Sequence, residues 1–230
     1  MCPTSAQTSH SPSPGSSQRP RACSVVATNQ RAASANAPRV AQAPGGPEED
    51  LDGDFRFGGW QAPHMDELIG ESVSAGIETM DALLLGRRTY EIFAAYWPHH
   101  RADVGIQLNA VPKYVASRGN PELSWEGSSL LGPDLVAEVT ALRDRHESTH
   151  VIGSINFVQT LLAERLFDVL TLWVYPVVLG EGKKVFPDGA RASGLRLLEP
   201  PVAGSSGAVQ RRYAPTGADP ATGTVEDPES

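Results

Sequence analysis

Two arginines follow a glycine at the end of a short apolar run, and this order of residues could bind phosphate. The run covers residues 82–85, and Gly86, Arg87 and Arg88 follow it. Such a run is typical of a strand buried on both faces, and the glycine permits a tight turn into a helix. The first N–H groups of a helix lack internal partners, so an anion can bind there, and arginine adds forked donors. The alternative is an ordinary strand-to-helix turn with solvated arginines.

A second segment repeats this order. We expect Thr89 to cap a first helix over residues 90–96. Further along, residues 149–152 read as an apolar strand, Gly153 and Ser154 as a turn, and residues 156–164 as a second helix. Ligands of open α/β sheets bind beyond the carboxyl ends of the strands, so two helix starts at one edge could hold two parts of a nucleotide.

Other clusters give weaker signals. The acids in residues 48–52 lack the spacing of a calcium loop. His99 and His100 are adjacent, and no third ligand follows at metal spacing. Cys2 and Cys23 both lie near the N-terminus, which leaves no cysteine site for the core and fits a reducing cytoplasm. We therefore predict no metal site.

Charge and composition exclude two classes of partner. The chain of 230 residues has a formal charge of −8, and residues 1–47 hold four arginines and no acid, so the remainder is more acidic still. An acidic body argues against nucleic acid as a partner, because phosphate neutralisation needs a basic face. No apolar run approaches the roughly 18 residues of a membrane span.

The pattern predicts one α/β domain between two tails. Residues 1–38 and 215–230 are rich in small and polar residues and are predicted to be disordered, although residues 24–28 could form a short strand. The domain covers residues 39–214. Its predicted helices include residues 66–78 and 134–146, and its predicted strands residues 113–116 and 169–178, followed by antiparallel strands at residues 195–198 and 208–213.

Four segments together resemble the dihydrofolate reductase superfamily, and most closely the reductase domain of the bacterial bifunctional deaminase-reductase of riboflavin biosynthesis. They are residues 84–91, 114–118, 151–154 and 176–183, and the loop over residues 42–46 and 58–60 is also similar. The resemblance covers about residues 40–213. It implies a three-layer fold with a central mixed sheet, flanking helices and an antiparallel C-terminal hairpin, and an NADPH site along one sheet edge.

The resemblance also implies roles for individual residues. Arginines at a helix start suit the extra phosphate of NADPH, whereas a ribose hydroxyl would call for an acid. Trp60 and Asp66 are candidates for the substrate side; alternatively, Trp60 anchors its loop and Asp66 serves the helix dipole. The implied cofactor-binding residues are Gly86, Arg87, Arg88, Thr89, Ser117, Arg118, Ile152, Gly153, Ser154, Ile155 and Asn156.

The sequence departs from the family pattern at two places. The family has a core strand and a Ser-Leu-Asp-Gly-like turn just before the Ala-Pro-Gly-Gly loop, whereas this chain has residues 35–39 there, and residues 24–28 would supply the strand at a different spacing. Ile155 stands where a glycine is usual, and its branched side chain could crowd a cofactor.

The expected activity is that of an NADPH-dependent reductase. Its hydride would go to a C=N or C=O group of a small pyrimidine- or pterin-like heterocycle, as in 5-amino-6-(5-phosphoribosylamino)uracil reductase or dihydrofolate reductase. We assign no catalytic residue. The alternative is a nucleotide-binding module that keeps the fold without turnover. The apolar strand over residues 170–178 makes a homodimer a reasonable expectation.

Overall fold

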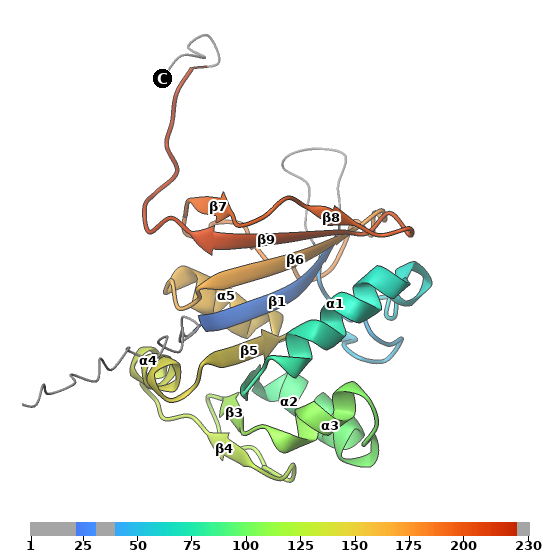
Figure 1. Ribbon diagram of the computed structural model, residues 1–230, viewed down its shortest axis with the longest axis vertical. Coiled ribbons are helices and arrows are strands. Elements are labelled where there is room, and N and C mark those ends of the chain that lie inside the picture. The colour runs from blue at the N-terminus through green and yellow to red at the C-terminus, as the bar shows by residue number, and fades with distance from the viewer. Residues whose placement is uncertain (1–21, 31–39, 225–230) are drawn as a thin grey trace, which may run out of the picture.

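The computed structural model describes residues 22–30 and 40–224, and it has an α/β architecture (Figure 1). Its described strands form one sheet in the order β4-β3-β2-β5-β1-β6-β9-β7, with β8 paired to β9. The strands are β1 (Ala22–Gln30), β2 (Ala82–Gly86), β3 (Lys113–Ala116), β4 (Ser128–Leu130), β5 (Ser148–Ile152), β6 (Val169–Tyr175), β7 (Leu195–Leu197), β8 (Val202–Ala203) and β9 (Val209–Pro215).

The helices cover both faces of this sheet, which gives three layers. One face carries α1 (Glu67–Glu78), α2 (Arg87–Tyr96) and α3 (Val104–Ala110), and the other carries α4 (Leu135–Arg145) and α5 (Ile155–Ala163). Strand β2 shows the alternation that separates the faces: Leu83 and Leu85 pack with α1 to α3, whereas Leu84 packs with α4 and α5. The predicted mixed sheet with flanking helices is confirmed.

Strand β1 lies in the middle of the sheet and corrects the predicted domain start. It pairs in parallel with β5 on one side and β6 on the other, with Val25 opposite both Val151 and Leu170. Cys23 and Val25 are fully buried. The predicted disordered tail over residues 1–38 is therefore wrong for residues 22–30, because pairing on both sides and burial stabilise this strand. The rest of that tail lies outside the described residues.

The C-terminal boundary also extends further than predicted. Strands β7 and β8 both pair antiparallel with β9, so the predicted hairpin is confirmed. Pro215 is the last residue of β9. Beyond it, the backbone N–H of Thr216 donates to the carbonyl of Gly194, and the N–H of Gly194 donates to the carbonyl of Ala218, both at 2.9 Å. Arg165 then forms an ion pair with Asp219 at 2.9 Å. The predicted tail over residues 215–230 is thus wrong for its first residues.

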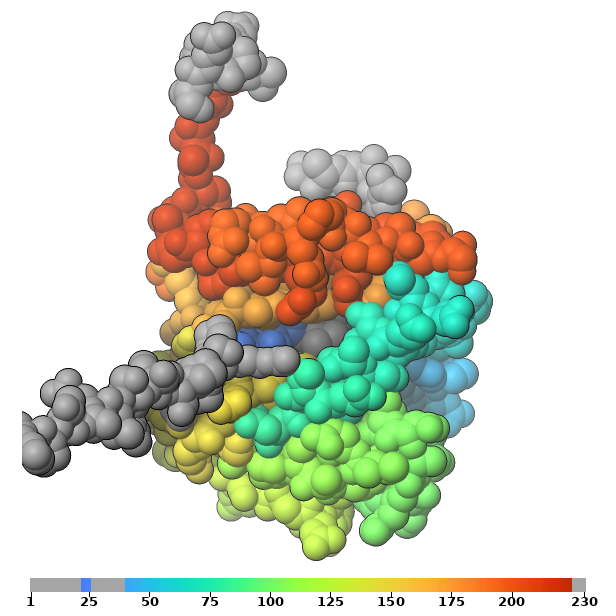
Figure 2. Space-filling view, viewed as in Figure 1, coloured from blue at the N-terminus to red at the C-terminus, as the bar shows by residue number. Residues whose placement is uncertain are grey.

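The two glycine corners differ in detail from the prediction. Helix α2 begins at Arg87 directly after β2, with Gly86 at its N-cap in an extended conformation, so the predicted cap at Thr89 is wrong. Helix α5 begins at Ile155 after Ser154, whose φ of 57° is left-handed. Figure 2 shows the face covered by α1 hollowed between this helix and the strands β6 and β9, with β1 visible at the bottom.

Candidate functional site

The two strand–glycine–helix corners meet at one edge of the sheet. Strands β2 and β5 are parallel neighbours, and the backbone N–H of Gly86 donates a 2.9 Å hydrogen bond to Oγ of Ser154. A Cβ atom on Gly86 would lie 3.2 Å from the Cβ atoms of Ser154 and Phe157, so the corners approach as closely as glycine allows. Helices α2 and α5 cover opposite faces, but their first turns converge, as the sequence predicts.

A connected cavity of about 2210 Å³ opens at this edge. Ends of three neighbouring strands contribute to it, because the carboxyl ends of the parallel strands β3, β2 and β5 lie side by side. The eleven residues predicted to bind a cofactor all line it, namely Gly86, Arg87, Arg88, Thr89, Ser117, Arg118, Ile152, Gly153, Ser154, Ile155 and Asn156. The structure therefore brings together residues that lie up to 70 positions apart in the chain.

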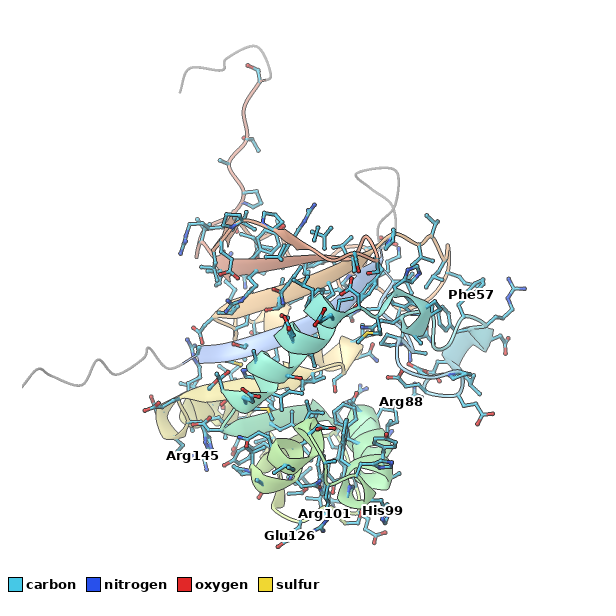
Figure 3. The ribbon with its side chains drawn as sticks, turned by 45° about the vertical axis from the view of Figure 1, so that its right-hand side comes forward. Phe57, Arg88, His99, Arg101, Glu126 and Arg145 are labelled. Carbon is cyan, nitrogen blue, oxygen red and sulfur yellow. The ribbon has the colours of Figure 1, made fainter. Side chains whose placement is uncertain are left out.

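Both arginines of the first corner already have partners. Arg87 forms an ion pair with Glu91 one turn along α2, at 3.0 Å. Arg88 forms two hydrogen bonds with the carboxylate of Asp52, one of them at 2.9 Å, and reaches Asp50 at 3.3 Å. In Figure 3, Arg88 lies on the side of α2 that faces the loop carrying Phe57. The predicted role of Arg88 as a phosphate ligand therefore requires these contacts to be exchanged.

The loop acids form a four-charge cluster with Arg88. Nζ of Lys183 lies 2.5 Å from Asp50 and 2.8 Å from Asp52. Hydrogen bonds from Arg88 and then from Lys183 hold the pKa of Asp52 well below its usual range. All four residues line the cavity. The sequence analysis missed this cluster. It considered the acids only as a calcium loop, and the two cations that pair with them lie far along the chain.

Arg118 is the arginine of this edge that remains available. It follows the end of β3, and it is exposed without an ion-pair partner among the residues that the structure describes. The preceding Ser117 accepts a 3.1 Å hydrogen bond from the backbone N–H of Gly119, which shapes the turn. Because Arg87 and Arg88 are paired within the protein, Arg118 is the cation best placed to meet an incoming anion.

Ile155 fits the corner without a glycine. The left-handed backbone falls on Gly153 (φ 65°) and Ser154 (φ 57°), which precede it. The side chain of Ile155 is partly buried and packs against the core cluster that contains Phe157 and Val158. The isoleucine at position 155, where a glycine is usual in the family, is thus accommodated by packing at the start of α5.

Trp60 and Asp66 have structural contacts and stand outside the cavity lining, although the structure describes both. The indole N–H of Trp60 donates to the carbonyl of Gln42 at 2.8 Å. Asp66 caps α1 and accepts a 2.9 Å hydrogen bond from the backbone N–H of Ser206, and these bonds, Ser206 first, lower its pKa. The geometry favours loop anchoring and helix capping over the predicted substrate roles.

Beyond Ile152 the cavity has an apolar wall. It lies between α1, α2 and α3, at the face of the sheet where Leu83 and Leu85 are buried. The side chains of this wall are Ile77, Ile92, Phe93, Trp97, Val104 and Leu108. An apolar slot beside a polar edge is the usual form of a small-molecule site.

Neither a metal cluster nor a membrane-spanning helix is found in residues 22–30 and 40–224. Within these ranges, no group of three or more His, Cys, Asp or Glu side chains is arranged to hold a metal ion. No helix in the same ranges combines the length and apolar character that crossing a membrane requires.

Solved structures show the same fold. A putative riboflavin biosynthesis protein from Shewanella sp. PV-4 aligns with a TM-score of 0.62 and 17% identity, covering 85% of this chain and 99% of that one. A pyrimidine reductase-like protein from Corynebacterium diphtheriae gives 0.52 and 13%, covering 86% and 92%. For a deaminase/reductase from Thermotoga maritima the values are 0.53 and 11%, and the match covers 86% of this chain and 57% of that longer one.

Sequence comparison identifies the family. The uncharacterized protein YyaP of Bacillus subtilis (strain 168) is 26% identical over 143 residues, which is 60% of this chain and 75% of that protein. The model of the RibD C-terminal domain matches residues 50–201, well over half of the chain. With the α/β layers and the converging corners described above, this match shows that the chain belongs to the RibD C-terminal domain family and has its dihydrofolate-reductase-like fold.

Proposed function

We propose that the protein is an NADPH-dependent reductase that acts on a C=N or C=O group of a small pyrimidine- or pterin-like heterocycle, as 5-amino-6-(5-phosphoribosylamino)uracil reductase does. The observation that carries this proposal is the convergence of the first turns of α2 and α5 in one cavity, joined by the bond between Gly86 and Ser154. NADPH, when bound, supplies a hydride, and the residues of the chain bind and orient it.

The edge offers suitable donors for a dinucleotide. The free N–H groups at the starts of α2 and α5 suit a pyrophosphate, because each helix end carries a partial positive charge. A Cβ atom on Gly153 would lie 3.4 Å from Cγ2 of Thr89, so the two corners leave little room between them and form a continuous backbone surface. Arg118 would take the phosphate on the adenosine ribose, with Ser117 beside the adenine.

The apolar wall beyond Ile152 would receive the substrate ring. A flat heterocycle placed there would lie beside the strand end where the nicotinamide is expected, and Phe93 and Trp97 provide apolar surface for it. The names of the structural relatives, a pyrimidine reductase-like protein and a riboflavin biosynthesis protein, support this substrate class. The family relation supports the reductase assignment.

Cofactor titration tests the proposal. NADPH and NADH binding would be followed by tryptophan fluorescence for the wild type, Arg118→Ala and Arg88→Ala. We expect Arg118→Ala to weaken NADPH binding by about 1.5–3 kcal/mol, roughly 10- to 150-fold, and NADH binding much less. Arg88→Ala should have a smaller effect, because its guanidinium is already paired with Asp52. No NADPH binding at about 50 µM would remove the reductase proposal.

One observation favours the second candidate, a nucleotide-binding module without turnover. Asp66, a candidate for the substrate side, uses its carboxylate to cap α1 and to hold Ser206. Oxidation assays with bound NADPH and a panel of pterins, pyrimidines and quinones separate the candidates. Binding without oxidation of NADPH across the panel would favour the module.

A further inference from the structure

Helix α1 leaves a gap above the sheet. Its residues at helical spacing toward the sheet are small, namely Ser72, Ala75, Gly76 and Thr79, and all four line the cavity. The two buried apolar residues of α1 are not part of this stripe: Ile69 precedes it in the chain, and Ile77 follows Gly76. Small side chains leave part of the space between α1 and the strands unfilled, and at one side of it Nε2 of Gln210 in β9 donates to Oγ of Ser72 at 2.5 Å.

The floor of this gap is polar on four adjacent strands. Ser24 of β1 lies opposite His150 of β5, and Thr171 of β6 lies opposite Arg212 of β9. These side chains share the face of the sheet that α1 crosses, and all of them line the cavity. The hollow visible in Figure 2 between α1 and the strands β6 and β9 has β1 at its floor.

The floor has hydrogen-bonding groups that the protein does not use. His150 is 7% exposed and Thr171 is 8% exposed. Nε2 of His150 lies 3.1 Å from Oγ of Ser148, while its Nδ1, like the hydroxyls of Ser24 and Thr171, makes no hydrogen bond within the described part of the chain. Because these groups line the open cavity, they are available to an occupant that both donates and accepts hydrogen bonds.

The charges around the gap are compensated. Burial lowers the pKa of His150 to about 4, so its imidazole is neutral at pH 7. At one end, Asp81 accepts hydrogen bonds from the backbone N–H groups of Glu147 and Ser148 at 2.8 and 3.0 Å. At the other end, Arg212 pairs with Glu199 at 3.1 Å. The neutral imidazole and the hydroxyls, with Arg212 at the edge of the floor paired to Glu199, favour an uncharged occupant.

We propose that the gap between α1 and the sheet, which we call the sub-helix site, binds a small uncharged polyhydroxylated molecule of the size of a pentose or hexose. Neighbouring strands lie about 4.8 Å apart, so a molecule of this size can reach Ser24, His150 and Thr171 together. Hydroxyl groups match the floor because each one donates and accepts. The inference rests on α1 and the sheet, and it does not depend on the proposed cofactor.

Two glycines of α1 provide a matched test. A Cβ atom on Gly76 would lie 3.9 Å from Cε1 of His150 with no other atom within 4 Å, so Gly76→Leu places its side chain in the sub-helix site. Gly70 has no atom within 4 Å of its added Cβ and does not line the cavity, although the structure describes it, so Gly70→Leu is the control. Both changes replace a helical glycine by a better helix former, which favours folding of both variants.

Binding would be measured by saturation-transfer NMR and by the Cε1–H signal of His150, assigned with His150→Gln. The probes are xylitol, arabinose and glucose, with inorganic phosphate and acetate as anionic comparisons. We expect one or more of the uncharged probes to bind the wild type and Gly70→Leu and to shift the His150 signal, and Gly76→Leu to weaken that binding at least about tenfold. Thr171→Val, which removes the hydroxyl and keeps the shape, should weaken it about fivefold.

Three results would overturn the proposal. They are binding of phosphate or acetate in preference to the uncharged probes, equal binding to Gly76→Leu and Gly70→Leu, and absence of any probe-induced shift of the His150 signal at probe concentrations up to about 100 mM. None of these results concerns NADPH, so a failure of the sub-helix site leaves the proposed reductase function standing, and a failure of NADPH binding leaves the sub-helix site standing.

Discussion

Ser154 joins the two corners of the proposed cofactor site and occupies a strained backbone position. Its Oγ accepts the hydrogen bond from the backbone N–H of Gly86 at 2.9 Å, and its φ is 57°. Ser154→Ala removes the acceptor and keeps the left-handed backbone, which leaves a partly buried N–H unpaired. We expect the free energy of unfolding to fall by about 1–2 kcal/mol, the range for a lost partner at a partly buried donor.

Ser154→Gly separates the two contributions. It removes the same acceptor, but glycine adopts the left-handed conformation freely, so about 1 kcal/mol of backbone strain is relieved. The net change should be about 0–1 kcal/mol, less than for Ser154→Ala. In a protein of this size, the alanine variant should therefore lower the Tm by roughly 2–8 °C and the glycine variant by less.

Urea denaturation provides the measurement, because a shift in midpoint at constant m reports stability alone. NADPH titration of both variants then shows whether the corner geometry is kept. If Ser154→Gly were as unstable as Ser154→Ala, backbone strain at this position would contribute nothing. If neither variant differed from the wild type in its free energy of unfolding, the hydrogen bond between Gly86 and Ser154 would not contribute to stability.

Two further predictions concern charged groups. Burial lowers the pKa of Lys113 to about 8. Between this pH and about 10.5, Lys113 is protonated in the unfolded chain and deprotonated in the folded chain. The free energy of unfolding should therefore gain a component that rises with pH in this range. Lys113→Met should remove that component in urea titrations from pH 7.5 to about pH 10, and an unchanged slope would contradict the assignment. Asp52→Asn should tighten NADPH binding about two- to tenfold, because it frees Arg88, whereas the control Asp54→Asn should have little effect in the same fluorescence titration.

Local sequence pattern is sufficient for the corners and for several other strands of the sheet, but it is insufficient for β1. Residues 82–86 and 148–152 are recognisable because both faces of each strand are buried and a glycine or turn follows at once. Strand β1 has no such signal, since Ser24 and Asn29 are polar and low-complexity sequence surrounds it. Its pairing with β5 and β6 comes from contacts more than 120 residues away, which a local window does not contain.

Helix α3 shows the same limit. Its sequence includes Gly105 and Asn109, which have weak helix propensity. The side chain of Asn109 donates to the carbonyl of Trp97 at 2.8 Å and accepts from the indole of Trp125 at 2.8 Å, and Leu108 is buried beneath it. The helix therefore depends on tertiary contacts that override propensity, and no expectation was possible from residues 104–110 alone.

The sequence predicted that the residues of the candidate site lie together, but it did not predict their ion pairs, and the reason bears on the proposed function. Arg88 and Lys183 meet Asp50 and Asp52 across separations of 36 to 133 residues, so the sequence shows cations without showing that they are paired. If a cofactor phosphate takes Arg88, the acidic loop must lose that partner, and by linkage a change that loosens the loop must strengthen phosphate binding by the same factor. Cofactor affinity would then report the state of the loop. Arg118, which has no such competitor among the described residues, would report the ribose phosphate alone.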